Sequence, residues 1–241
     1  MYSSGGIVLS PAFIDASIFL PPLGTQANDI CDAIYQILKG NPNFLKNGYP
    51  STGAVVDARG VSGTANLTCT HGSPWTEGNS SVSVPSTILL PAGAIVVSTG
   101  WVLPTNTHLI GEGDAISSGT VIRAASNLGN MISFYSSFVP PQNSPASAYT
   151  GIAVEKLVLD GNSKPVNGIV NNWAVGLSYV DHVSLYRILG TGLGIGGVAS
   201  GSGPYTNINF DTGGSAATSS TVCAQIVATA GGPGSRPFCG R

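Results

Sequence analysis

Charged side chains are scarce in this 241-residue chain, because Asp, Glu, Lys and Arg together supply only 8% of the residues. Soluble domains usually hold about a quarter, and the exposed faces of helical bundles depend on such residues. The composition therefore argues against a helical bundle. The formal net charge is −2, and the Lys and Arg residues form no cluster. We expect no nucleic-acid partner, because binding to phosphates needs a basic face.

Long apolar runs are also absent. No stretch reaches the roughly 18 residues needed to cross a bilayer, so we expect no membrane partner. The four cysteines contain no CxxC pair, which argues against a zinc site or a thioredoxin-type motif. Two interpretations of Cys31 and Cys69 stay open. They form a disulfide that ties an N-terminal helix to the following loop, as suits an oxidising compartment, or they are unpaired thiols.

Glycine and proline are abundant, with 33 and 16 residues, and 42% of the chain is hydrophobic. This composition favours many short strands joined by turns. One helix is predicted at residues 28–40, with Asn28 or Asp29 as its N-cap and Gly40 at its end. Its apolar residues recur at helical spacing: Ile30, Ile34, Ile37 and Leu38.

Large apolar residues recur at intervals of about 25 residues, at Leu109, Phe134, Leu159, Leu185 and Phe210. Another apolar residue stands two positions before each of the last four, at Ile132, Leu157, Val183 and Ile208. Two inward side chains separated by one outward residue indicate a strand. A repeat of this length predicts stacked coils, whereas the alternative, a β-sandwich, predicts no constant repeat. The predicted helix would then cover the N-terminal end of the stack.

Four motifs follow one another in the first half of the chain: GAVVDARG at 53–60, TILLPAG at 87–93, WVLP at 101–104 and LIGEG at 109–113. In this order they resemble the opening of pectin-lyase-like proteins, a superfamily that includes pectate lyases, polygalacturonases and phage tailspikes. The resemblance covers about residues 27–212. It implies an all-β, right-handed parallel β-helix and a secreted, extracellular protein, although no signal peptide is visible in the sequence.

The predicted helix and the extent of the apolar repeat set the expected domain organisation. Residues 1–26 would be an N-terminal extension, residues 27–227 the β-helix with its helix cap at 28–40, and residues 228–241 an irregular tail. The chain would thus be a short or C-terminally truncated member of the superfamily. The Asp-Asp pair and Gly-His-Gly turn of polygalacturonases are missing, and no dense acidic cluster matches the calcium ligands of pectate lyases. The resemblance therefore speaks for the fold more than for a reaction.

The proposed register predicts two columns of outward side chains. One holds Lys156, His182 and Asn207, and the other holds Asp160, Tyr186 and Asp211. Because stacked strands lie about 4.8 Å apart, the backbones of Asp160 and Asp211 would be roughly 10 Å apart. This lies near the upper end of the roughly 6.5–9.5 Å carboxyl separation of inverting glycosidases. Asp160 and Asp211 are thus predicted as the acid and base, with His182 assisting proton transfer.

The residues predicted to bind substrate are Lys156, Tyr186, Tyr135, Asn207, Asn209 and Arg187. In an alternative reaction, elimination, Arg187 or Lys156 removes the proton and calcium binds Asp160. No other cofactor or metal is expected. In a further alternative, Asp160 and Asp211 are turn residues that cap strand ends.

Two function classes remain. The first is a polysaccharide hydrolase or lyase that acts on an acidic glycan in an outward groove. The second is a non-catalytic, glycan-binding or structural extracellular β-solenoid. Self-association through an open C-terminal end is a further expectation, because an uncovered strand edge invites pairing.

Overall fold

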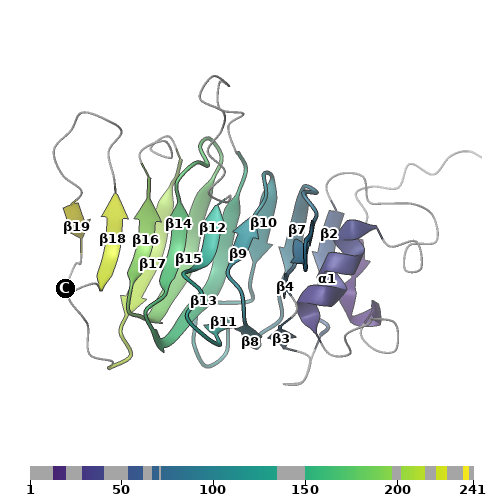
Figure 1. Cartoon of the computed structure of the whole chain (residues 1–241), viewed down its shortest axis with the longest axis horizontal. Helices are drawn as coiled ribbons and strands as arrows, with labels where there is room; N and C mark the ends of the chain where they lie inside the picture. Colours follow the sequence, from purple (N-terminus) through teal and green to yellow (C-terminus); the bar gives the residue numbers. More distant parts are fainter. Residues whose placement is uncertain are drawn as a thin grey trace, which may run out of the picture.

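The computed structural model describes residues 13–19, 29–40, 54–61, 67–70, 72–134, 150–196, 202–214, 221–226 and 236–238. These residues are mostly β structure, and two large sheets with mainly parallel pairing dominate them (Figure 1). Tyr135 and Cys239 lie outside the described residues.

The larger sheet has ten strands. They are β1 (Phe13–Asp15), β2 (Ala54–Asp57), β3 (Thr68–Cys69), β7 (Ser86–Leu89), β8 (Gly93–Val97), β10 (Thr107–Ile110), β11 (Thr120–Ala124), β13 (Ala153–Lys164), β15 (Tyr179–Ile188) and β17 (Tyr205–Asp211). The smaller sheet has six strands, namely β9 (Trp101–Leu103), β12 (Asn130–Phe134), β14 (Asn167–Asn171), β16 (Thr191–Ile195), β18 (Val222–Ile226) and β19 (Arg236–Phe238). A third, antiparallel sheet contains β4 (Gly72–Ser73), β5 (Thr76–Glu77) and β6 (Ser80–Ser81).

The chain visits three strand positions in a repeating order. Strands β7, β8 and β9 are followed by β10, β11 and β12, and each member of the second set pairs in parallel with its counterpart in the first. The long strand β13 then pairs with β10 through its first half and with β11 through its second half. Successive turns of the chain are therefore stacked, and we call this assembly the stack. It is consistent with the predicted all-β parallel solenoid.

A single residue bends each long strand between these two positions. Lys156 in β13, His182 in β15 and Asn207 in β17 all have positive φ values, of 55°, 52° and 52°. Left-handed backbone at one residue turns the chain sharply without a loop. The three predicted column residues thus lie at corresponding places in successive turns, but at a bend rather than within a flat strand.

Apolar side chains form the interior of the stack. Ile95, Ile122, Leu159, Leu185 and Phe210 are register partners on successive strands. The first three are completely buried and Leu185 is 3% exposed, whereas Phe210 on the last strand is partly buried. Such a column removes apolar surface from water that no single turn could cover alone.

The predicted constant repeat of about 25 residues holds only for the later turns. Leu159, Leu185 and Phe210 do form one column. The assignment of Leu109 and Phe134 to it was wrong, because Leu109 pairs with Ile88 and Val154 while Phe134 pairs with strands of the six-stranded sheet. Connections of different length separate the strands of the early turns, so equal spacing along the sequence does not mean an equal place in the turn.

Helix α1 (Ile30–Lys39) confirms the predicted helix. The side chain of Asp29 caps its N-terminus and Gly40 ends it in the left-handed conformation. The predicted apolar stripe is at most 2% exposed and belongs to the same core as the strands. Figure 1 shows α1 beside β2, at the end of the stack where the sheet begins. A short 3-10 helix, η1 (Ala16–Phe19), contacts α1 there.

Two predicted boundaries differ from the structure. Strand β1 lies inside the predicted N-terminal extension, yet it pairs in parallel with β2. Strand β19 lies inside the predicted irregular tail, yet it pairs antiparallel with β18. Both segments are short, and their alternation is too brief to be recognised without the neighbouring strand that supplies the hydrogen-bonding partners.

Candidate functional site

The predicted column of Asp160, Tyr186 and Asp211 has the expected register, because Tyr186 pairs with both aspartates on adjacent strands. The prediction that Asp160 faces solvent was wrong. Its side chain is completely buried, and so is that of Val158 on the same strand. Leu157 and Leu159 face the core as predicted, but Arg123 and Tyr186 flank Asp160 in the register and the guanidinium groups of Arg123 and Arg187 cover its carboxylate.

Asp160 is held by two guanidinium groups. Arg123 Nε donates to its Oδ2 at 2.7 Å, and Arg187 Nε donates to its Oδ1 at 3.0 Å. The backbone N–H of Asn162 donates to Oδ1 at 2.8 Å. Burial by itself raises the pKa of Asp160, but the hydrogen bonds from Arg187 and Arg123 outweigh it and hold the pKa below its ordinary value. Asp160 is therefore an ionised anchor with no proton to donate, which argues against the predicted role as the acid.

Asp211 is exposed and its Oδ1 accepts the backbone N–H of Gly213 at 2.7 Å. This contact is the turn-capping arrangement that the sequence offered as the alternative to catalysis. The ring of Tyr186 lies against the guanidinium of Arg187, with 4.9 Å between the guanidinium carbon and the ring centroid. Asn209 is exposed on the last strand, opposite Ser184. The predicted catalytic and substrate-binding roles of these residues stay predictions.

A polar patch that the sequence did not single out lies along the first half of strands β13 and β15. Glu155 and Asp181 are direct register partners. Tyr179 donates its hydroxyl to Glu155 Oε1 at 2.6 Å, and this bond is the main cause that raises the pKa of Tyr179 to about 12. The rings of Tyr179 and His108 meet edge to face, with centroids 6.2 Å apart. Only the register brings these residues together, because His108 and Tyr179 flank the small residue Ala153.

Asp181 anchors the other end of this patch. It accepts hydrogen bonds from Thr206 Oγ1 and Asn207 Nδ2, each at 2.8 Å, and lies 2.9 Å from His182 Nδ1. Together these bonds, with Thr206 the largest contributor, lower the pKa of Asp181 to about 2. His182 thus pairs with the residue that precedes it in the same strand.

A groove lies on the outer face of the six-stranded sheet, across strands β12, β14, β16 and β18. Its lining is rich in amides and small residues: Asn130, Asn167, Val170, Asn172, Thr191, Gly194, Ile195, Gly196 and Gln225. Val170, Gly194 and Gln225 are register partners on three successive strands, next to the inward column of Ile169, Leu193 and Ala224. Because the central one of the three is glycine, the sheet surface has no side chain there, and a groove is left.

Hydrogen bonds fix one wall of this groove. Asn167 Nδ2 donates to Asn130 Oδ1 at 2.9 Å, and Asn167 Oδ1 accepts the backbone N–H of Thr191 at 2.8 Å. The side chains of Asn172, Thr191 and Gln225 make no hydrogen bond to the residues that the structure describes. The groove thus combines oriented amides with unused donors and acceptors. Amide and hydroxyl groups both donate and accept, as sugar hydroxyls do.

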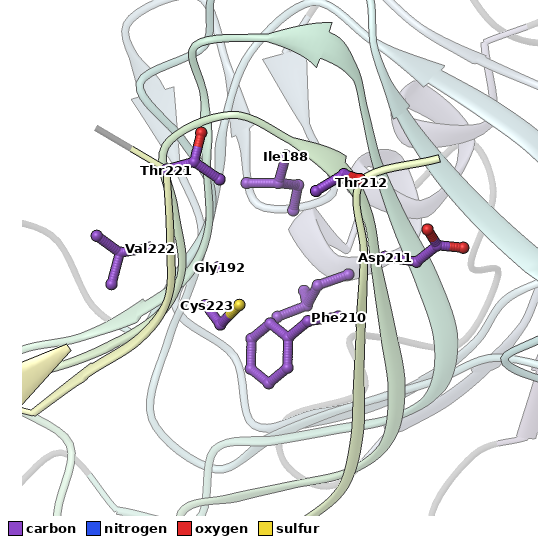
Figure 2. Close-up of a pocket in the computed structure, with 9 residues that line it drawn as sticks. Ile188, Gly192, Phe210, Asp211, Thr212, Thr221, Val222 and Cys223 are labelled. Atoms are coloured by element: carbon purple, nitrogen blue, oxygen red, sulfur yellow. The ribbon is translucent and has the colours of Figure 1, made fainter. Parts of the chain in front are cut away.

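A second hollow lies inside the last turns of the stack. Figure 2 shows Phe210, Ile188 and Cys223 around one space between the strands. Cys223 is disulfide-bonded. The mainly apolar lining makes this hollow the interior of the final turn rather than a polar site. The expected self-association through this end stays a prediction.

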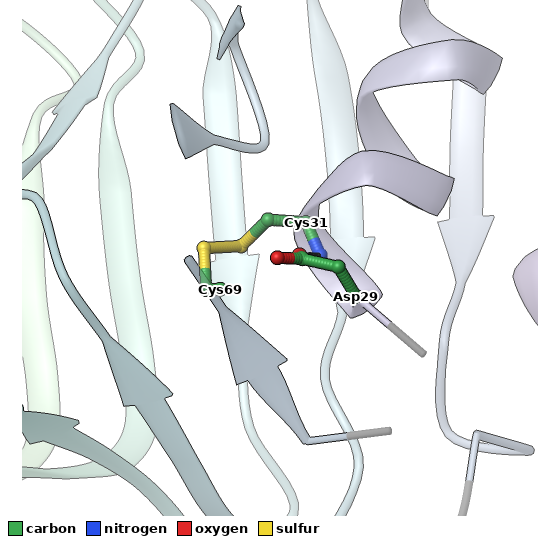
Figure 3. A group of neighbouring side chains, drawn as sticks. All are labelled: Asp29, Cys31 and Cys69. Carbon is green, nitrogen blue, oxygen red and sulfur yellow. Dashed lines mark hydrogen bonds between the residues drawn. A yellow bond between two sulfur atoms is a disulfide. The ribbon is translucent and has the colours of Figure 1, made fainter. Parts of the chain in front are cut away.

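One group of side chains has the composition of a metal site, namely Asp29, Cys31 and Cys69 (Figure 3). Its donors are already used. Cys31 and Cys69 form a disulfide, which selects between the two interpretations left open by the sequence. Asp29 Oδ1 accepts from the backbone N–H groups of Cys31 and Asp32, at 2.9 and 3.2 Å, and Oδ2 accepts from Thr70 N at 2.7 Å. The group therefore fastens α1 to β3.

Comparisons with protein-family models, with curated proteins and with solved structures find no match for this chain. Among the described residues, no helix has the length and apolar character to cross a membrane.

Proposed function

We propose that this protein is an extracellular, right-handed parallel β-helix that binds a glycan in the groove on its six-stranded sheet. The observation that carries the proposal is the set of amides that line the groove beside Gly194, of which Asn130 and Asn167 are held in place by hydrogen bonds. Aligned amides can bond several hydroxyls of an extended sugar chain at once. The parallel register supports the β-helix, and right-handed crossovers join about 98% of parallel strands in one sheet.

Binding without turnover fits this groove better than catalysis does. Its lining contains amides, a hydroxyl, glycines and aliphatic side chains, and none of its lining residues is a carboxylate. Hydrolysis of a glycosidic bond by the usual route needs two carboxyl groups beside the scissile bond. The alternative of a glycan-binding solenoid is therefore preferred over a hydrolase or lyase for the groove.

A second candidate function, hydrolysis, is favoured by the pair Glu155 and Asp181. Adjacent strands hold their backbones about 4.8 Å apart, and retaining glycosidases separate their carboxyl groups by about 5–5.5 Å. Asp181, with its pKa lowered to about 2, would be the ionised nucleophile. Glu155, bonded to Tyr179, would be the acid and base. Polysaccharide cleavage lost in Asp181→Asn but kept in Asp211→Asn would favour this pair. The opposite result would favour the pair Asp160 and Asp211 predicted from the sequence.

Secretion and the choice of partner belong to the same proposal. The Cys31–Cys69 disulfide supports an oxidising compartment. The low charge and the scattered basic residues support a glycan rather than a nucleic acid or a membrane as the partner.

The test is a binding screen with pectin, alginate and xylan, followed by a variant that fills the groove. A Cβ at Gly194 would meet only methyl groups of Val170 and Thr191, at 3.7 Å or more. Gly194→Leu should therefore fold normally and weaken binding about tenfold or more, because several hydrogen bonds are lost.

Gly176→Leu is the matched control, since a Cβ at Gly176 meets nothing within 4 Å and the residue lies outside the groove. Equal affinity of wild type and Gly194→Leu would refute the groove as the binding site. Release of reducing or unsaturated ends, measured with and without calcium, would favour a hydrolase or lyase instead.

A further inference from the structure

Two guanidinium groups share one carboxylate in the second half of strand β13. Arg123 and Arg187 both hydrogen-bond to Asp160, so the local cluster of three side chains carries one unneutralised positive charge. The carboxylate is completely buried, whereas the side chains of Arg123 and Arg187 are 36% and 26% exposed. The surplus positive charge therefore faces outward.

Both guanidinium groups converge on a single oxygen atom. Arg123 Nε and a terminal nitrogen of Arg187 each donate to Asp160 Oδ2. The two guanidinium groups are thus neighbours around the same carboxylate oxygen. A pair of guanidinium forks is well suited to carboxylate and sulfate oxygens, which accept hydrogen bonds in pairs.

Arg187 is held in place before any ligand arrives. The guanidinium of Arg187 lies over the ring of Tyr186. A Cβ added at Gly213 would come 2.6 Å from Cγ of Arg187, so the backbone of this turn packs directly against the arginine. Because the side chain of Arg187 is already ordered, a ligand would lose little affinity to ordering it.

Donors remain for a ligand. Arg123 uses its Nε on Asp160, and Arg187 uses its Nε and one terminal nitrogen. Among the described residues, the other guanidinium N–H groups of these two arginines have no partner. The nearest acidic residue in the same column, Asp211, lies beyond Tyr186 and caps Gly213.

We propose that Arg123 and Arg187 form an anion site that binds the acidic group of a glycan, either a uronate carboxylate or a sulfate ester. This inference rests on the proposed function, because the ligand is taken to be a glycan. It adds a charged position on the ten-stranded sheet to the uncharged groove on the six-stranded sheet. Asp160 is the positioning residue that holds both arginines.

The experiment measures binding of polygalacturonate, dextran sulfate and neutral dextran to the whole chain by calorimetry, at low and high salt. Arg123→Gln should weaken binding of an acidic polymer about tenfold, since charge-assisted hydrogen bonds are lost. Its fold should survive, because Arg187 still neutralises Asp160; a thermal melt checks this. Preference for polygalacturonate or for dextran sulfate identifies the acidic group.

Arg59→Gln is the matched control. Arg59 is bound to Asp57 by two hydrogen bonds in a pair with no surplus charge, so this variant should keep the affinity of the wild type. Equal losses in both variants, or no binding of either acidic polymer by the wild type, would overturn the anion site. An effect of Gly194→Leu without any effect of Arg123→Gln would remove this inference and leave the proposed function standing.

Discussion

Arg187 reaches back across one turn of the stack to Asp160, 27 residues earlier, and donates its Nε to Oδ1 at 3.0 Å. The carboxylate that receives this bond is completely buried. The ion pair thus joins β13 to β15, and Arg123 extends it to β11.

Replacing Asp160 with Asn should destabilise the fold by about 3 kcal/mol, because removal of one partner from a buried ion pair leaves the others uncompensated. Urea denaturation measures the change in the free energy of unfolding. Asp57→Asn is the control: its partner Arg59 is 46% exposed, so solvent screens the lost charge and the cost should be much smaller. Similar costs in both variants would contradict the buried anchor.

The same ion pair predicts how stability depends on pH. The pKa of Asp160 is lower in the folded state than its ordinary value, so the unfolded state takes up a proton first as the pH falls. The stabilisation is therefore complete above about pH 4, the ordinary value for Asp, and is lost as the pH falls through the lower folded pKa. The free energies of unfolding of the wild type and of Asp160→Asn, measured as the pH is lowered, should therefore converge in that range. A constant difference down to pH 2 would exclude this cause.

Asp181 should titrate near pH 2 because Thr206, Asn207 and His182 stabilise its charged form. Thr206→Val should raise this pKa, since Thr206 makes the largest contribution. Carboxyl carbon shifts in an NMR titration report the value directly. Thr221→Val is a suitable control, because the hydroxyl of Thr221 donates to the carbonyl of Leu189 rather than to Asp181. An unchanged titration of Asp181 in Thr206→Val would show that the hydrogen bond is not formed in solution.

The disulfide between Cys31 and Cys69 closes a segment with a sequence separation of 38. Its removal in a Cys31→Ala, Cys69→Ala double variant should cost about 2–4 kcal/mol, because the unfolded chain regains conformational freedom. Denaturation under oxidising conditions, where Cys223 stays bonded, measures this cost. If the free energy of unfolding falls by less than the error of the measurement, Asp29 and the apolar face of α1 hold the helix without the disulfide.

Truncation of apolar residues should show that the final turn of the stack contributes less to stability than an interior turn. Leu159→Ala removes a completely buried side chain and should cost about 2–5 kcal/mol. Phe210 belongs to the same column but is only partly buried on the last strand, so Phe210→Ala should cost less, although the side chain is larger. The comparison uses thermal or urea denaturation. A greater cost at Phe210 would show that the final turn is covered in solution.

The candidate site was only partly predictable. The register of Asp160, Tyr186 and Asp211 followed from spacing, because the last turns have nearly equal lengths. The burial of Asp160 did not, since its carboxylate is covered by Arg123 and Arg187, which come from other strands of the stack. The amide groove was missed because Asn130, Asn167 and Gln225 are far apart in the sequence and carry no recognisable motif.

Local chemistry in the sequence determined helix α1, whose cap at Asp29, apolar stripe and final Gly40 all lie within one short segment. It also determined the inward column of the later turns, because Leu159, Leu185 and Phe210 recur at nearly constant spacing. Only the tertiary structure decided which strands are neighbours in the early turns, where connections of unequal length shift the repeat. For that reason the partners of Asp160 and the groove around Gly194 depend on the stacking of whole turns, which no single segment encodes.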